Sequence, residues 1–294
     1  MHVEFARLAA ARKIMAVSAS TGSLVEDRAN AERWILRFGG AAGPDDGATI
    51  EAAERFVVVR PALTAANAPR VLYIHGGGMV YYSTAVFLPF LRALAGALRA
   101  PVEAFDYLKA PEHSVEQSLG QLAAQVAARS EASRDRPLVI AGDSVGGLLA
   151  LYLCLRVLPG VFSRLVLIYP VLDLRTERES YRTFGEGYFL DGAAMRRFKS
   201  ILGPYFSGCR LDPFDLSEDD VTRLPACSLV TAGCDVLRDE AVAWSEYLAE
   251  RGTKPRHLRF PDLPHDFCLY AGKLGSARRA VAEIAATAFH LEGE

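Results

Sequence analysis

Short apolar runs alternate with longer segments of helical periodicity along most of this chain. Runs rich in Val, Ile and Leu, typical of buried strands, occupy residues 71–75, 102–107, 138–141, 165–169, 228–232 and 256–260. Segments with the apolar spacing or composition of helices occupy residues 85–98, 115–129, 148–158, 240–251 and 276–291. This alternation predicts an α/β fold whose central sheet is mostly parallel and carries helices on both faces.

The pattern changes near the start of the chain and again between residues 173 and 223. The first segment predicts a helix over 3–19, strands over 34–38 and 55–60, and a loop over 39–47. The second is polar and rich in glycine, with one helix expected over 193–202. A long excursion of this kind inside an α/β domain is usually a lid or a binding element.

The aromatic residues of the 173–223 segment have two interpretations. They either line an apolar pocket or pack the segment onto the main body, and packing is the expected role of most of them. The residues concerned are Tyr181, Phe184, Tyr188, Phe189, Tyr205 and Phe206.

Composition narrows the class of protein. The 294 residues suit one large α/β domain or two small ones, and we expect a single domain over 1–294. A net charge of −2 without a basic block gives no support to nucleic-acid binding or electrostatic membrane docking. Charged residues among the first twenty argue against a signal peptide, and no run is long enough to span a membrane. We therefore expect a cytoplasmic protein.

The five cysteines show neither the pairing of a disulfide framework nor the spacing of a zinc site. Reduced, mostly buried thiols are the expected state. No metal and no cofactor are predicted.

Residues 142–146, Gly-Asp-Ser-Val-Gly, lie between a predicted strand and a predicted helix. A strand that turns sharply into a helix exposes the serine at its apex, and small residues on either side let the backbones pass closely. Ser144 is therefore the candidate nucleophile. The N–H of Val145 lies at the start of the helix, where backbone donors lack intrahelical partners and the helix dipole favours negative charge.

A serine hydroxyl needs a base within hydrogen-bond reach, and the base needs an orienting acid. Among the six histidines, His265 follows the last predicted strand after a short loop over 261–264, where a base above the sheet is expected. Asp235 lies three residues beyond the predicted strand 228–232. The chain order Ser144, Asp235, His265 is that of an α/β-hydrolase, and the sequence predicts that the three side chains meet.

Three glycines follow the strand at 71–75, in the sequence His75-Gly76-Gly77-Gly78. Glycines let backbone N–H groups turn toward a ligand without obstruction by side chains. Upstream of a nucleophile turn, this segment is a strong candidate for the second half of an oxyanion hole.

The chain resembles the hormone-sensitive-lipase-like family of α/β-hydrolases, which includes bacterial carboxylesterases and relatives of arylacetamide deacetylase. The resemblance rests on residues 75–78, 106–107 with 110–113, 142–147, 235 with 237–240, and 265 with 267. It implies an α/β-hydrolase fold with a helical cap built from about residues 1–40 and 173–223. It further implies Ser144, His265 and Asp235 as nucleophile, base and orienting acid, and Gly77, Gly78 and Val145 as oxyanion donors. His75 and Asp143 are then structural.

Several positions depart from the usual pattern of that family. Met79 replaces an aromatic residue, Tyr82 stands where glycine is common, Val145 replaces alanine, and Asp266 replaces a small residue. The charge of Asp266 is expected to raise the pKa of His265.

The expected activity is hydrolysis of small to medium acyl esters, with a small-molecule ester as the partner. Amide or special-ester cleavage in a biosynthetic pathway is the first alternative. A non-hydrolytic binding protein or a lyase on the same fold is the second, and the intact candidate triad argues against it. The sequence leaves a homodimer open.

Overall fold

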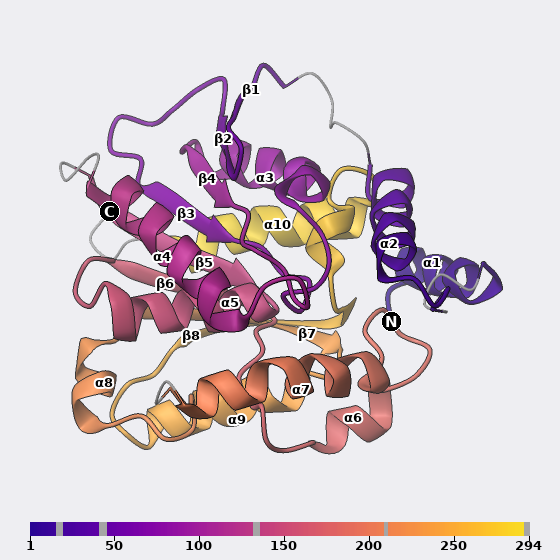
Figure 1. Ribbon diagram of the computed structural model, residues 1–294. Helices are drawn as coiled ribbons and strands as arrows, with labels where there is room; N and C mark the ends of the chain where they lie inside the picture. The colour runs from indigo at the N-terminus through magenta and orange to yellow at the C-terminus, as the bar shows by residue number, and fades with distance from the viewer. Residues whose placement is uncertain (16–19, 41–45, 132–135, 209–210, 291–294) are drawn as a thin grey trace.

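The computed structural model describes residues 1–15, 20–40, 46–131, 136–208 and 211–290, and its central element is an eight-stranded sheet (Figure 1). The strands lie in the order β1-β2-β4-β3-β5-β6-β7-β8. Their bounds are β1 Thr49–Ala52, β2 Phe56–Arg60, β3 Arg70–Ile74, β4 Val102–Phe105, β5 Leu138–Asp143, β6 Arg164–Ile168, β7 Ala226–Cys234 and β8 Arg256–Pro264. Strands β3 to β8 run parallel, whereas β2 is antiparallel to both β1 and β4. The mostly parallel sheet is confirmed.

Helices cover both faces of this sheet, as the alternating pattern predicts. The helices in the first half of the chain are α1 Val3–Ile14, α2 Leu24–Phe38, α3 Thr84–Leu98, α4 Val115–Glu131 and α5 Val145–Tyr152. The later ones are α6 Glu179–Phe184, α7 Gly192–Gly208, α8 Glu218–Arg223, α9 Arg238–Ala249 and α10 Gly275–Ala288. A π-helical turn, η1 Leu153–Val157, continues α5, and a 3₁₀ turn, η2 Phe267–Tyr270, follows β8.

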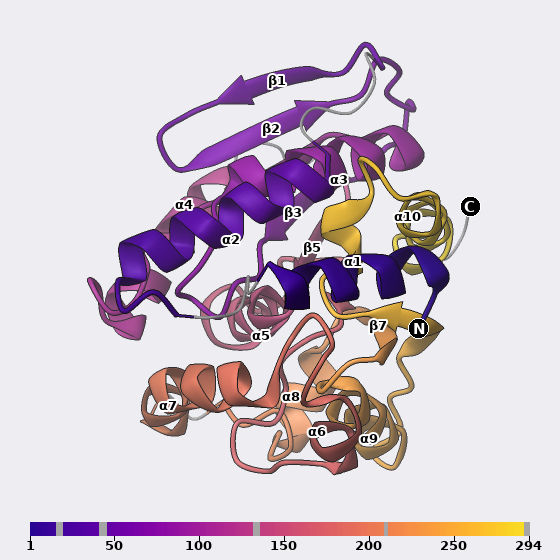
Figure 2. The ribbon, with the colours of Figure 1, turned by 90° about the vertical axis from the view of Figure 1, so that its right-hand side faces the viewer.

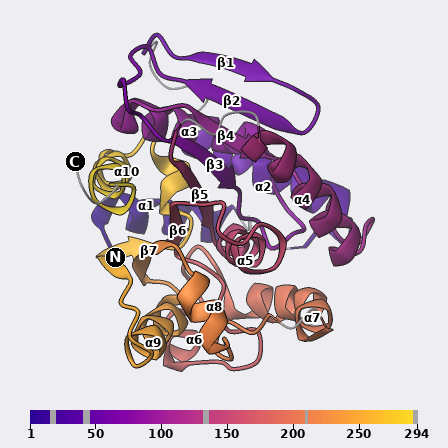
Figure 3. The same ribbon diagram turned by 90° about the vertical axis from the view of Figure 1, so that its left-hand side faces the viewer.

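Successive side chains of β3 point to opposite faces of the sheet and therefore pack into two different halves of the core. Val71 and Tyr73 pack in one cluster with residues of α3 and α10, whereas Leu72 and Ile74 pack in the other with residues of α4, α5 and α9. All four side chains are fully buried, which is why β3 lacks polar alternation. Figures 2 and 3 show β1 and β2 at one end of the molecule and α6 to α9 at the other.

The strand expected over 34–38 is wrong, because these residues form the end of helix α2. The side chain of Ser23 accepts a hydrogen bond from the Glu26 N–H and caps this helix. Near its other end the buried Trp34 donates its indole N–H to the Tyr270 hydroxyl at 3.0 Å. Tertiary packing of an apolar helix face therefore overrides a local pattern that also suits a strand.

Other boundaries differ by less. Strand β1 lies where no element was expected, and it forms the antiparallel edge of the sheet. Strand β8 continues through Pro264, so that no loop separates it from His265. Residues 41–45 of the expected loop, residues 16–19 of the expected first helix and residue 291 of the expected last helix lie outside the described residues.

Candidate active site

The segment around Ser144 joins β5 to α5 through a single residue in an unusual conformation. Ser144 has a φ of 54°, which is rare for a residue with a side chain. Two backbone hydrogen bonds hold it: the Ser144 N–H donates to the Ile168 carbonyl, and the Val171 N–H donates to the Ser144 carbonyl, both at 2.9 Å. The strained turn is thus fixed by the end of strand β6 and by the residues that follow it.

Glycine is required on either side of Ser144 because other backbone segments approach these two positions closely. A Cβ atom on Gly142 would overlap the carbonyl of Gly146, and one on Gly146 would overlap the carbonyl of Ile74 at the end of β3. The tight turn from strand to helix predicted from the sequence is therefore present in the structure.

The structure brings the side chains of Ser144, His265 and Asp235 together. The Nε2 of His265 lies 3.0 Å from the Ser144 Oγ, and its Nδ1 lies 2.7 Å from the Asp235 Oδ2. The other oxygen of Asp235 accepts the Leu237 N–H at 3.0 Å. All three residues are buried, so these contacts form in a medium of low dielectric constant.

Opposing effects set the pKa of His265. Burial disfavours the imidazolium, whereas the negative charges of Asp235 and Asp266 favour it, and the net result raises the pKa to about 9. The Asp266 Oδ1 lies 3.6 Å from the His265 Nε2, on the opposite side of the ring from Asp235. Carboxylates therefore face both ring nitrogens.

Hydrogen bonds from and to buried side chains fix the glycine segment that follows β3. The N–H of Gly76 donates to the Asp143 Oδ1 at 2.8 Å, and the Tyr73 hydroxyl donates to the same oxygen at 2.6 Å. The Tyr107 hydroxyl donates to the Gly76 carbonyl at 2.9 Å, and the Tyr107 ring stacks on His75. Burial raises the pKa of Asp143 to about 7, against the lowering effect of these hydrogen bonds.

Gly77 and Gly78 continue this segment with φ values of 113° and 64°. Within the described residues, neither N–H donates to another protein group. Such unpaired backbone donors beside a serine hydroxyl suit a developing oxyanion. The N–H of Val145, at the first position of α5, adds a third donor of the same kind.

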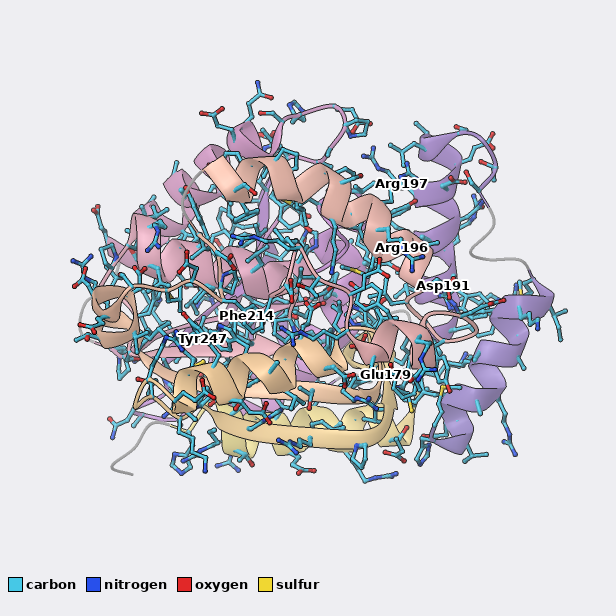
Figure 4. The ribbon with its side chains drawn as sticks, turned by 90° about the horizontal axis from the view of Figure 1, so that it is seen from below. Glu179, Asp191, Arg196, Arg197, Phe214 and Tyr247 are labelled. Carbon is cyan, nitrogen blue, oxygen red and sulfur yellow. The ribbon has the colours of Figure 1, made fainter. Side chains whose placement is uncertain are left out.

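A cavity of about 350 Å³ opens over Ser144, His265 and the two glycines. Its far wall comes from α1, α2 and the segment between them, and from α7 with the segment before it. The residues contributed by these elements are Arg12, Ser20, Asp27, Ala31, Phe189, Leu190, Asp191, Ala193, Ala194, Arg197 and Phe198. Figure 4 shows Asp191 and Arg197 at the end of α7 that lies nearest α1 and α2.

The aromatic residues of the 173–223 segment mostly pack, as expected. Tyr181 and Phe206 are buried in the core, and among the six only Phe189 lines the described cavity. Phe198, which was not among them, covers Gly78 so closely that a Cβ atom on that glycine would overlap its ring.

The charged residues of the far wall were not expected from the sequence. Arg12 of α1 donates to the Phe189 carbonyl at 3.4 Å and lies over the rings of Phe189 and Trp34. Asp27 belongs to α2, whose C-terminal part was interpreted as a strand. No local signal relates these positions to residue 144, because only the packing of α1 and α2 brings them to the cavity.

Neither a metal site nor a membrane-spanning helix is found in the part of the chain that the structure describes. No group of three or more His, Cys, Asp or Glu side chains there could hold a metal ion, and no helix there is long and apolar enough to cross a bilayer. Four cysteines, Cys154, Cys227, Cys234 and Cys268, are buried and free, whereas Cys209 lies outside the described residues.

Known proteins with similar sequences include several esterases. The chain is 31% identical over 232 residues to an esterase of Gibberella moniliformis, a match that covers 74% of this chain and 73% of the relative. It is 32% identical over 222 residues to an ethyl acetate hydrolase of Pseudomonas putida, covering 70% of this chain and 67% of that protein.

The fold is also shared with solved structures. An alpha/beta hydrolase enzyme from the metagenome of Lake Arreo superposes with a TM-score of 0.81 at 27% identity, covering 97% of this chain and 96% of that one. The family model described as alpha/beta hydrolase fold matches residues 71–269, which include Ser144, Asp235 and His265. The chain therefore belongs to the α/β-hydrolase fold family, in agreement with the resemblance noted in its sequence.

Proposed function

We propose that this protein is a serine esterase that hydrolyses small to medium acyl esters through Ser144, His265 and Asp235. The observation that carries the proposal is the continuous set of contacts from Asp235 through His265 to Ser144, at 2.7 and 3.0 Å, on the floor of a cavity. The relatives named esterase and ethyl acetate hydrolase support ester bonds as the target.

In the first half of the reaction, the Ser144 Oγ forms a bond to the ester carbonyl carbon while its proton passes to the His265 Nε2. Asp235 holds the ring in the tautomer that leaves Nε2 free to accept this proton, and it stabilises the imidazolium that forms. The bond from carbon to the alcohol oxygen then breaks, and Nε2 returns the proton to the leaving alcohol. Water then forms a bond to the acyl carbon while one of its protons passes to the His265 Nε2. The bond from carbon to the Ser144 Oγ breaks, Nε2 returns the proton to Oγ, and the carboxylic acid leaves.

The N–H groups of Gly77, Gly78 and Val145 are the proposed oxyanion donors. Their preorganisation is supported by the hydrogen bonds that fix Gly76 and by the position of Val145 at the start of α5. Donors held in advance lower the barrier because they need no reorganisation when the charge develops.

We also propose that α1, α2 and the 173–223 segment act as a cap over a single α/β-hydrolase domain. Residues from these elements form the far wall of the cavity, and they include Arg12, Asp27 and Phe198. A cavity of about 350 Å³ lies near the lower end of the range for small-molecule sites, which favours short acyl and alcohol groups.

The test is turnover of an acyl-length series of aryl esters, combined with labelling by a fluorophosphonate probe. Ser144→Ala should reduce kcat by about 10⁴-fold or more and abolish labelling, because the nucleophile is lost. The matched control is Ser200→Ala, which changes an exposed serine of α7 outside the cavity lining and should keep both properties. Full turnover by Ser144→Ala would reject the proposal. Labelling of Ser144 without turnover of any simple ester would instead favour the amide or special-ester alternative.

A further inference from the structure

The Nε2 of His265 has two oxygen neighbours of different kinds. The Ser144 Oγ lies 3.0 Å away, and the Asp266 Oδ1 lies 3.6 Å away. The side chain of Asp266 is 18% exposed, and the part that remains accessible lines the cavity above Ser144. A carboxylate therefore lies beside Nε2, the nitrogen that accepts and donates the proton in the proposed reaction, on the side of the ring that faces the cavity.

The backbone holds Asp266 in this position. Its φ of 61° is left-handed, and it begins the 3₁₀ turn η2, in which the Leu269 N–H donates to the Asp266 carbonyl at 3.0 Å. The next residue, Phe267, is fully buried against Tyr169 and Phe260, so the turn cannot rotate without disrupting the core. Asp266 is thus a fixed wall of the site.

The leaving alcohol must come to the same place. When the bond between the acyl carbon and the alcohol oxygen breaks, the His265 Nε2 donates its proton to that oxygen, which requires a separation of about 2.6–3.2 Å. An oxygen at that distance from Nε2, on the cavity side, is a neighbour of the Asp266 carboxylate. We therefore expect the group attached to the alcohol oxygen to contact Asp266.

The charges around Asp266 decide which alcohol suits it. An ionised carboxylate only accepts hydrogen bonds, so it favours a donor. Burial raises the pKa of Asp266, whereas the charges of the His265 imidazolium and of Arg12, which lines the same cavity, favour its ionised form. A neutral hydroxyl group can donate to this carboxylate without adding a further charge to a cavity that Arg12, Asp27, Asp191 and Arg197 already line.

We propose that Asp266 is a specificity residue that selects esters whose alcohol carries a hydroxyl group on the carbon next to the ester-bearing carbon, that is, monoesters of vicinal diols. The inference rests on the proposed esterase function and names the alcohol side of its substrate. The second hydroxyl of the alcohol donates its proton to the Asp266 carboxylate in a hydrogen bond. The ester chemistry at Ser144 is unchanged.

The test compares 2-hydroxyethyl acetate with propyl acetate, which has a methyl group in place of the hydroxyl. The wild-type protein should prefer the hydroxylated ester in kcat/KM by about tenfold or more, the size expected for a hydrogen bond to a charged group. Both kcat/KM values refer to the same free enzyme, so the ratio of the two values is independent of any change in the pKa of His265.

Two variants test whether the preference for the hydroxylated ester depends on Asp266. Asp266→Gly keeps the left-handed backbone accessible and should bring the ratio to about one. Asp262→Asn changes a carboxylate at an exposed position of β8, outside the cavity lining, and should leave the ratio as in the wild type. Fluorophosphonate labelling of Ser144 shows that each variant is folded and has a reactive serine.

The outcomes separate the two proposals. A wild-type protein without the preference overturns the inference, and so does an unchanged ratio in Asp266→Gly or an equal loss in Asp262→Asn. In each of these cases, inactivity of Ser144→Ala leaves the esterase function standing. Turnover by Ser144→Ala would overturn the esterase function itself.

Discussion

The α-carbon of Gly146, in the first turn of α5, lies against the carbonyl group of Ile74 at the end of β3, so that a Cβ atom there would overlap it. We predict that Gly146→Ala displaces α5 from the sheet and moves Ser144 away from His265. Unfolding in urea should show a loss of at least about 2 kcal/mol, and kcat/KM should fall by more than tenfold. The control is Gly96→Ala in α3, where a Cβ atom has nothing within 4 Å and alanine should be neutral or slightly stabilising. Equal stability of the two variants would contradict the packing argument.

The activity should depend on pH through His265. As a base, its ring must be neutral, and its pKa is raised to about 9 by the carboxylates of Asp235 and Asp266 against the opposing effect of burial. Below this pH the imidazolium predominates, so kcat/KM should rise with pH and level off above about 9. The other groups that act on the ring are the buried Asp143 and, through Asp266, Arg12.

Asp266→Asn should move this profile to lower pH, because it removes one of the negative charges that favour the imidazolium. The measurement is kcat/KM between pH 6 and 10 for one aryl ester. Asp262→Asn, at an exposed position of β8, serves as the control and should retain the wild-type profile. Superimposable profiles for the wild type and Asp266→Asn would show that the carboxylate does not act on His265.

The turn at Ser144 was predictable because its determinants are local. A strand, two glycines and a helix lie within a few residues of Ser144, and the sheet order places the end of β5 beside that of β3 with its glycines. His265 and Asp235 were predictable from their positions after β8 and β7, since ligands of parallel sheets gather at the carboxyl ends of strands.

The far wall of the cavity was not predictable in the same way. Helix α2 owes its packing to Trp34 and Tyr270, which are 236 residues apart, and the segment around Trp34 has apolar spacing that also suits a strand. Arg12, Asp27 and Arg197 fall within the cap ranges that the family resemblance implies, but no local pattern singles them out, and only tertiary structure assigns them individually to the cavity. The notable exception is Asp266, whose proximity follows directly from its place next to His265.

A buried group of charges should contribute strongly to stability. Glu103 of β4 accepts two hydrogen bonds from Arg70 of β3, at 2.7 and 3.1 Å, and one from Arg129 of α4, at 2.6 Å. We predict that Glu103→Ala costs about 3–5 kcal/mol, because Arg70 is left buried without its partner. Glu51→Ala, which breaks the exposed pair with Arg60, should cost less than about 1 kcal/mol in the same urea titration. Similar losses for both variants would show that burial of the pair is irrelevant.

Glu240 in α9 should make the protein less stable as the pH rises. Its Oε1 accepts the N–H groups of Leu172 and Asp173, and its buried Oε2 has no hydrogen-bond partner among the described residues. Burial raises the pKa of Glu240 to about 8. An acid whose pKa is higher in the folded state binds an extra proton there, so stability falls between the unfolded value near 4.5 and about 8, by up to about 1.4 kcal/mol per pH unit.

Glu240→Gln keeps an oxygen for the two N–H groups of Leu172 and Asp173 and removes the titration. Relative to the wild type, the variant should therefore gain stability on going from pH 5 to pH 8.5, as measured by urea unfolding at both values. Glu246→Gln, in the same helix but at an exposed position, should show no such gain, because solvent screens its charge. A constant difference between Glu240→Gln and the wild type at both pH values would mean that Glu240 is ionised in the folded protein, where the charge of Lys199 favours the ionised form.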